Sequence, residues 1–169
     1  LHLSIRRQRQ MCIRDRGQGF AGETGNIYGD RFSEFDTPEM GLRATFRDLR
    51  NKMKEFDGDV DKMITKFAPP RENVTSKYIN RIKKVIGKDK KITDKNLNKV
   101  VKEMVAIESD DNPEMIRYYL DNPNIINAAE ELSYIDMPSN TTGETAKKLY
   151  YEGEYPRKHG GMVMRNYYD

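Results

Sequence analysis

Carboxylates are the side chains of this sequence that are best suited to chemistry. Zinc sites need several His or Cys ligands, and a cysteine nucleophile needs a thiol beside a base. The chain has a single cysteine, Cys12, and two histidines, His2 and His159. Catalysis by this chain would therefore rely on Asp or Glu, and we expect neither a metal ion nor a cofactor.

Glu108 is the carboxylate whose surroundings fit acid catalysis best. It ends the apolar face of a predicted helix, beside Val105 and Ile107. A general acid works best when burial raises its pKa toward neutrality, and a glutamate at the inner end of a helix is placed for that role. The alternative is an ordinary polar residue at a helix end, with Ser109 and Asp110 beginning the next cap.

The elements that would position this residue are short helices. Apolar residues recur at spacings of three and four, and caps or prolines mark the helix starts. The first predicted helix begins after Thr37, with Leu42, Phe46 and Leu49 on its apolar face. The later helices are predicted to begin at Asp59, Thr75, Thr93, Asn112, Asn122 and Thr142.

The fold class predicted from this pattern is all-α, a small bundle of short helices. One minor β-hairpin is predicted at residues 26–35, where aromatic and branched residues flank a glycine-containing turn. The residues expected in the core are Phe46, Leu49, Met53, Phe67, Ile79, Ile82, Val101 and Val105.

Residues 6–16 resemble a translated sequencing adapter. Residues 6–15 read RRQRQMCIRD, which is similar, codon for codon, to one frame of the adapter used for transposase-based libraries. We expect residues 1–16 to be a non-native segment and the natural chain to start near Gly17, without its true N-terminus. The segment holds five Arg and one Asp, so the net charge of +3 becomes −1 without it. Basicity then gives no argument for nucleic-acid binding.

Three blocks of the sequence resemble phage-encoded and prophage-encoded cell-wall-degrading proteins. Residues 31–44 read RFSEFDTPEMGLRA, similar to that family's signature F-D/A-S/T-P-E-x-G-I/L-R-A. Residues 67–79 read FAPPRENVTSKYI, similar to its block W-A-P-P-x-E-N-D-T-x-x-Y-I. Residues 104–113 read MVAIESDDNP, where the family has a helix ending in H-E-N-G-x-N-P. The family's opening segment N-N-P-G-N-I/L-R has no counterpart here.

The resemblance implies a lysozyme-like helical domain that cleaves the glycan strands of peptidoglycan. Glu108 then resembles the glutamate of the family's E-N-G-x-N-P and of the E-S-x-x-N-P motif of lytic transglycosylases, where it is the catalytic acid. Glu23, in a glycine-rich and flexible loop, is the reserve candidate. A second carboxylate would make a hydrolase. Without one, the glutamate would act as acid and then base while a hydroxyl of the substrate closes the ring, and the sequence leaves both open.

The same resemblance implies a substrate groove. We expect the groove to be lined by the end of the helix before Glu108 and by the loop at residues 22–30. Tyr28 in that loop is expected to stack against a sugar ring, and Asn112 is expected to contact the substrate.

Most of the matching residues are interpreted as structural. Residues 37–39 start a helix, Gly41 lets a neighbouring backbone approach, and the prolines at 69–70 make a rigid corner. Arg43 is expected to pair with a carboxylate such as Asp36, and a surface pair of this kind contributes little stability.

The expected organisation is the non-native segment 1–16, the lysozyme-like domain 17–132, and an extended polar, Tyr-rich tail 133–169 with one weak helix. Bacterial peptidoglycan is the expected partner, together with other virion proteins, and we expect no specific nucleic acid and no membrane insertion. No signal peptide is visible, so the expected location is the phage virion or the host cytoplasm or periplasm during infection.

Two alternative functions remain open from the sequence. The first is a non-catalytic virion structural protein that uses the same helical domain as a scaffold or glycan-binding unit. The second is a small helical nucleic-acid binder, which the corrected charge disfavours. Its basic residues would be Arg71, Lys77, Arg81, Lys83 and Lys84.

Overall fold

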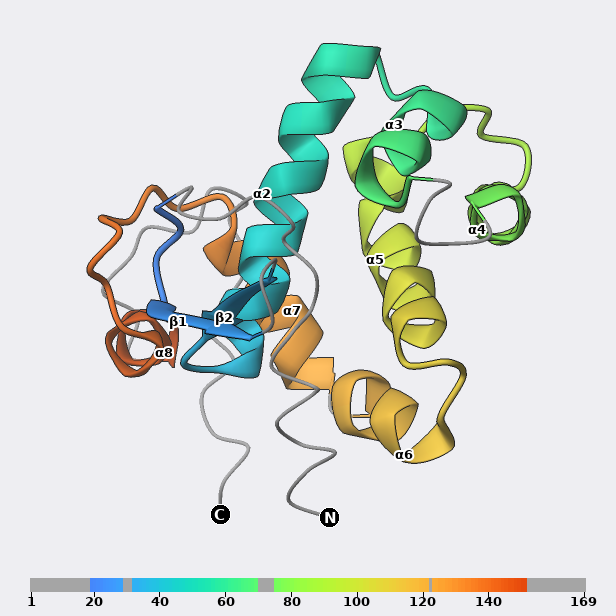
Figure 1. The fold of residues 1–169 in the computed structure, drawn as a ribbon. Coiled ribbons are helices and arrows are strands. Elements are labelled where there is room, and N and C mark those ends of the chain that lie inside the picture. The colour runs from blue at the N-terminus through green and yellow to red at the C-terminus, as the bar shows by residue number, and fades with distance from the viewer. Residues whose placement is uncertain (1–18, 29–31, 70–74, 122, 152–169) are drawn as a thin grey trace.

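The computed structural model describes residues 19–28, 32–69, 75–121 and 123–151 (Figure 1). Over these residues the chain is mostly helical with one antiparallel hairpin, so the predicted all-α fold with a minor hairpin is confirmed. The elements are β1 (Glu23–Tyr28), β2 (Phe32–Phe35), α2 (Pro38–Phe56), α3 (Val60–Phe67), α4 (Thr75–Ile86), α5 (Asp94–Glu108), α6 (Pro113–Ile116), the π-helical turn η1 (Arg117–Asp121), α7 (Pro123–Leu132) and α8 (Gly143–Tyr151). The predictions for residues 1–16 and for most of the proline corner lie outside the described residues.

Local caps begin the helices where the sequence predicts them. Thr37 Oγ1 accepts a hydrogen bond from Met40 N at 3.4 Å, and Asp59 Oδ1 accepts one from Lys62 N at 2.9 Å. Each cap satisfies a first-turn N–H that the helix itself leaves unpaired. The predicted starts of α2 and α3 are therefore confirmed, and Asp59 is a cap.

The hairpin begins earlier than predicted. β1 pairs antiparallel with β2, with Glu23 opposite Phe35. Gly22 has a φ of +83°, which glycine adopts without strain, and its carbonyl accepts a hydrogen bond from Asp36 N at 3.0 Å. These pairings place Glu23 at the start of a strand, so the prediction that it lies in a flexible loop is wrong.

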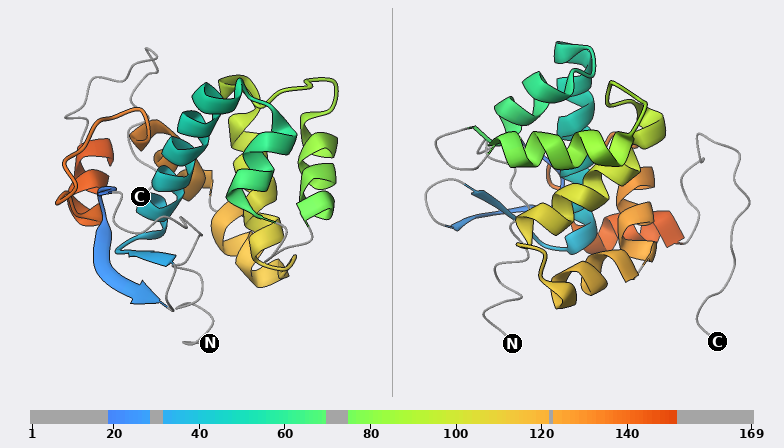
Figure 2. Two further views of the ribbon diagram at one scale, coloured as in Figure 1. Left: turned by 45° about the horizontal axis from the view of Figure 1, so that its top comes forward. Right: turned by 90° about the vertical axis from the view of Figure 1, so that its right-hand side faces the viewer.

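The helix α2 runs through the middle of the molecule and has a hydrophobic core on each side. α3, α4 and α5 lie on one side of it, and the hairpin and α8 lie on the other (Figures 1 and 2). Leu42, Phe46 and Leu49 face the larger core. Of the predicted core residues, Phe46, Leu49, Ile82, Val101 and Val105 are buried, and Met53, Phe67 and Ile79 are partly buried against the same core.

The smaller core extends the domain beyond the predicted boundary. Met40 and Ala44 of α2 contribute to it together with Leu132, and Ala146 of α8 is fully buried in it. The weak helix predicted near the C-terminus is therefore present as α8 and is packed against α2. The expectation of an extended tail does not hold for residues 133–151, because their small and apolar side chains cover this second face of α2.

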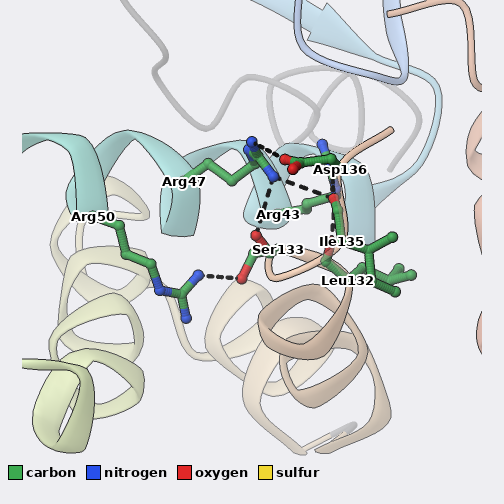
Figure 3. A network of polar contacts seen from close by, with 7 residues as sticks. All are labelled: Arg43, Arg47, Arg50, Leu132, Ser133, Ile135 and Asp136. Carbon is green, nitrogen blue, oxygen red and sulfur yellow. Dashed lines mark hydrogen bonds and ion pairs between the residues drawn. The ribbon is translucent and has the colours of Figure 1, made fainter. Parts of the chain in front are cut away.

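Arg43 is buried inside the domain and does not form a surface ion pair. It is 2% exposed, and it donates from Nε to Leu132 O at 3.0 Å and from Nη2 to Ile135 O at 2.8 Å (Figure 3). A helix leaves its last carbonyls without intrahelical partners, and Arg43 supplies donors at the end of α7. Burial lowers the pKa of Arg43 to about 10, and the nearby Arg47 adds to this effect. The predicted pairing with Asp36 is therefore wrong.

Arg47 and Arg50 continue this arrangement along the same face of α2, four and seven positions after Arg43. Arg47 Nη2 pairs with Asp136 Oδ1 at 2.7 Å. Arg50 donates to the hydroxyl of Ser133 (Figure 3). The Cζ atom of Arg50 also lies 3.8 Å from the centroid of the Tyr134 ring. The three arginines thus fix α2 against the end of α7 and the turn that follows it.

Candidate active site

Glu108 is the last residue of α5, and its side chain is exposed. The burial that we expected around it is therefore absent. The reason is that α5 ends at this residue, beyond the buried positions Val101, Met104 and Val105. A catalytic role for Glu108 stays a prediction, but the shielding that would support it is not there.

The turn that follows Glu108 is held by Arg81. Asp110 and Asp111 have φ values of 52° and 53°, in the left-handed region that Asp tolerates better than most residues. Arg81 donates two hydrogen bonds to the carboxylate of Asp111, at 2.7 and 2.8 Å, and one to Glu103 at 2.5 Å. The hydrogen bonds from Arg81 hold the pKa of Asp111 below its usual value. This turn is therefore ordered by a charged anchor from α4.

Asn112 caps the short helix α6. Its Oδ1 accepts a hydrogen bond from Glu114 N at 3.0 Å, and its backbone carbonyl accepts one from Ile116 N at 3.0 Å. The predicted start of a helix at this Asn-Pro pair is therefore confirmed. The side chain of Asn112 is exposed, and its contact with a substrate stays a prediction.

Glu23 and Tyr28 lie at the two ends of β1. Glu23 is half-buried, at the edge where the hairpin meets α2. Tyr28 pairs with Phe32 at the other end of the strand. The side chain of Tyr28 lies outside the described part of the structure, so its predicted stacking on a sugar stays a prediction.

Three carboxylates near the start of α2 share one property. Among the residues that the structure describes, Glu23 Oε1, Asp36 Oδ1 and Glu39 Oε2 are buried and have no hydrogen-bond partner. We call these three atoms the shielded oxygens. A buried acceptor without a donor costs about 1–3 kcal/mol, and more when the group is charged. A hydrogen-bond donor that reaches such an atom is therefore stabilising.

Asp36 joins the first turns of two helices. Its Oδ2 accepts a hydrogen bond at 2.6 Å from Gly143 N, at the start of α8, and it precedes Thr37, the cap of α2. The partial positive charge at both helix ends favours a carboxylate at this point. A Cβ on Gly143 would lie 2.5 Å from Thr37 Oγ1 and 2.6 Å from Asp36 Oδ1, so only glycine lets α8 approach this closely. We therefore assign Asp36 to the docking of α8.

Glu39 is the most deeply buried of the three carboxylates. Its side chain is 7% exposed, and its Oε1 lies 3.1 Å from Lys147 Nζ on α8. From the sequence, Glu39 is expected only to be part of a helix start. It precedes Leu42 and Phe46 by three and seven positions, which places it on an apolar face of α2. A charged residue in that register was the signal for its burial.

Tyr119 of η1 is a buried tyrosine whose pKa is raised. It is 4% exposed, and burial raises the pKa of its hydroxyl, with smaller contributions from Tyr118 and Glu39. A tyrosine that stays protonated remains a hydrogen-bond donor.

The residues predicted for the site form two groups on opposite sides of α2 (Figure 2). Glu23 and Tyr28 belong to the hairpin, and Glu108 and Asn112 follow α5. The N-terminal part of α2, which carries Glu39, lies between the two groups. The structure thus keeps Glu23 and Tyr28 at opposite ends of β1, and it places Glu108 and Asn112 on either side of the turn after α5. Glu39 is a central carboxylate that sequence reasoning missed.

The described residues give little support to a metal site or to a nucleic-acid site. They contain no group of three or more His, Cys, Asp or Glu side chains arranged to hold a metal ion. Two of the basic residues of the nucleic-acid hypothesis are paired with acids, Arg81 as above and Lys83 with Asp61 at 2.7 Å. Arg71 lies outside the described residues. Within the same ranges, no helix has the length and apolar character needed to cross a membrane.

Comparisons of the chain with protein-family models, with curated proteins and with solved structures find no match.

Proposed function

We propose that this chain cleaves the glycan strands of peptidoglycan and that Glu23 is the proton donor. The observation that carries the proposal is the shielded oxygen of Glu23, on a side chain that is only partly buried. A general acid needs both properties, because it must be partly shielded from water and must reach the glycosidic oxygen. The resemblance of residues 31–44 and 67–79 to wall-degrading phage proteins supports the choice of substrate.

Glu23 fits this role better than the other two carboxylates discussed for it. The side chain of Glu108 is exposed at the end of α5 and lacks the shielding that a general acid needs. Glu39 is 7% exposed and is paired with Lys147, so a glycan reaches it less easily. We assign Glu39 to holding α8 against the start of α2.

The chemistry follows from a single glutamate. Glu23 gives its proton to the glycosidic oxygen as the bond to the sugar carbon breaks, and positive charge develops on the ring. The resulting carboxylate then takes a proton from the group that attacks the sugar carbon. That group is water in a hydrolase and a hydroxyl of the same sugar in a lytic transglycosylase. The products distinguish the two, because only the second reaction leaves an anhydro end.

A second function is favoured by a specific observation. Asp36 and Glu39 both contact α8, through Gly143 N and Lys147 Nζ. These contacts stabilise the packing of the domain without any chemistry. A non-catalytic virion protein that binds or supports the wall would need the same contacts, so this function is the alternative to cleavage.

Purified cell-wall sacculi separate these functions. The chain is incubated with sacculi, and turbidity, soluble glycan and protein bound to the pellet are measured. Cleavage by Glu23 predicts clearing by the wild type, loss of clearing with Glu23→Gln, and near-normal clearing with the matched control Glu108→Gln. Clearing by Glu23→Gln at the wild-type rate would remove Glu23 from the role. Binding to the pellet without clearing by any of the proteins would favour the structural function.

A further inference from the structure

Tyr118 presents an aromatic ring to solvent. In the part of the chain that the structure describes, it is the large hydrophobic side chain that is exposed, at 46%. It lies in the π-helical turn η1, shortly after the turn that carries Glu108 and Asn112. π-Helical turns are rare and occur often at functional sites. Binding of a ligand to the ring would explain why it is exposed in such a turn.

The ring of Tyr118 is held in place by its neighbour. Its centroid lies 5.1 Å from that of Tyr119, with an angle of 88° between the two planes, which is a favoured edge-to-face arrangement. Tyr119 is itself buried in the larger core. The exposed ring is therefore preorganised, and binding a flat ligand to it costs little conformational entropy.

Exposed polar side chains precede Tyr118 in the sequence. Asn112, Glu114 and Arg117 are exposed on the turn and the helix that lead into it. Amide, carboxylate and guanidinium groups provide both acceptors and donors for hydroxyl and acetamido groups. The C–H groups on one face of a pyranose fit a flat aromatic ring, and the hydroxyl groups around its rim fit polar side chains beside that ring.

We infer that Tyr118 is a stacking platform for one sugar ring of the glycan strand. The inference rests on the proposed function, and it assigns a subsite on the side of α2 that carries Glu108. The C–H groups of the sugar carry partial positive charge and contact the negative face of the ring. The neighbouring polar side chains bind the hydroxyl and acetamido groups.

Two other occupants fit the surroundings less well. A protein partner needs a patch of several apolar side chains, and Tyr118 stands alone as an exposed large hydrophobic residue among those described. A nucleic acid would meet acidic side chains, since Glu108, Asp110 and Glu114 are all exposed near this stretch. Carboxylates repel phosphates but accept hydrogen bonds from neutral sugars.

A tryptophan at position 118 provides a direct test, because the chain contains no tryptophan. The variant Tyr118→Trp keeps a stacking ring and introduces a unique fluorophore. The probe is an oligosaccharide of four β-1,4-linked N-acetylglucosamine units. We expect its emission to shift in a saturable way as the sugar is added. The matched control Lys84→Trp places tryptophan on the exposed face of α4, and its emission should not respond.

Binding of the same oligosaccharide by calorimetry or NMR gives the second readout. Tyr118→Ala should weaken binding about tenfold or more, whereas Tyr118→Phe should keep it within about threefold, because the ring is retained. Circular dichroism checks that each variant is folded. Unchanged binding by a folded Tyr118→Ala, or a Tyr118→Trp emission that does not respond to the sugar, would overturn the inference.

These outcomes remain separate from those that concern cleavage. If the oligosaccharide binds through Tyr118 but sacculi are not cleaved, the platform stands and the proposed catalysis fails. If sacculi are cleaved at the wild-type rate and with the wild-type KM by Tyr118→Ala, and its binding is unchanged, the catalysis stands and the platform fails.

Discussion

Replacement of Arg43 tests the explanation of how α2 and α7 are held together. Arg43 is 2% exposed and donates two hydrogen bonds to carbonyls at the end of α7. Hydrogen bonds from a charged donor contribute about 1.5–3 kcal/mol each, and the cost of burying the guanidinium offsets part of this. We expect Arg43→Ala to lower the free energy of unfolding by about 3–4 kcal/mol, which corresponds to a fall in Tm of roughly 10 °C.

Urea denaturation followed by circular dichroism at the helix band measures this change, and two variants sharpen it. Arg43→Met keeps most of the side-chain volume but has no hydrogen-bond donors. We expect it to lower the free energy of unfolding by about 2–3 kcal/mol. Arg47→Met is the matched control on the same face. Because the side chain of Arg47 is 31% exposed, we expect Arg47→Met to lower the free energy of unfolding by only about 1 kcal/mol. If Arg43→Met were as stable as the wild type, the two hydrogen bonds would not be what stabilises this contact.

Two further predictions concern α8 and the turn after α5. Gly143→Ala brings a Cβ to 2.5 Å from Thr37 Oγ1. We therefore expect the free energy of unfolding to fall by about 1–3 kcal/mol and the amides of α8 to exchange hydrogen faster. Unchanged exchange in α8 would contradict the proposed close approach. Arg81 lowers the pKa of Asp111 in the folded state below the ordinary Asp value of 3.8. The ionised Asp111 therefore contributes its full stabilisation at pH values above 3.8, and this stabilisation is lost as the pH falls through the lower pKa of the folded state. Asp111→Asn keeps a side chain that tolerates the left-handed backbone, so it should lower the urea midpoint at about pH 7 and have little effect at about pH 2. An equal loss at both pH values would show that the carboxylate charge is not responsible.

The parts of the fold that the sequence predicted are those set by local chemistry. Thr37 followed by proline, and Asp59 before an apolar repeat, specify helix starts within a few residues of chain. Apolar spacing likewise identified the buried faces around Phe46 and Ile82. These features could be predicted because capping and helical periodicity depend on neighbours in the sequence.

The features that the sequence missed depend on partners far along the chain. Arg43 binds backbone carbonyls of Leu132 and Ile135, and a backbone carbonyl has no sequence signature. The early start of β1 depends on pairing between Glu23 and Phe35 across the hairpin. α8 is packed because Gly143 permits a close approach to α2, which no local pattern reveals.

The candidate site was predicted only in part for the same reason. Glu23 was named from the sequence, but the burial of its oxygen depends on the folded chain and has no local sequence signal. Glu108 was named from its motif and from apolar neighbours, and its exposure follows from the point at which α5 ends. Glu39 lay in an apolar register that the sequence displayed, and a charged residue in such a register is a usable signal of burial.

The release of soluble glycan fragments from purified sacculi tests the central claim most directly. Mass spectrometry of the supernatant measures the initial rate of release for the wild type and for Glu23→Gln, and it identifies reducing or anhydro ends. The proposal predicts release by the wild type and a rate lower by about 10²–10⁴-fold for Glu23→Gln, because removal of a general acid has an effect of that size. Equal rates of release by the two folded proteins, or no release by the wild type, would contradict it.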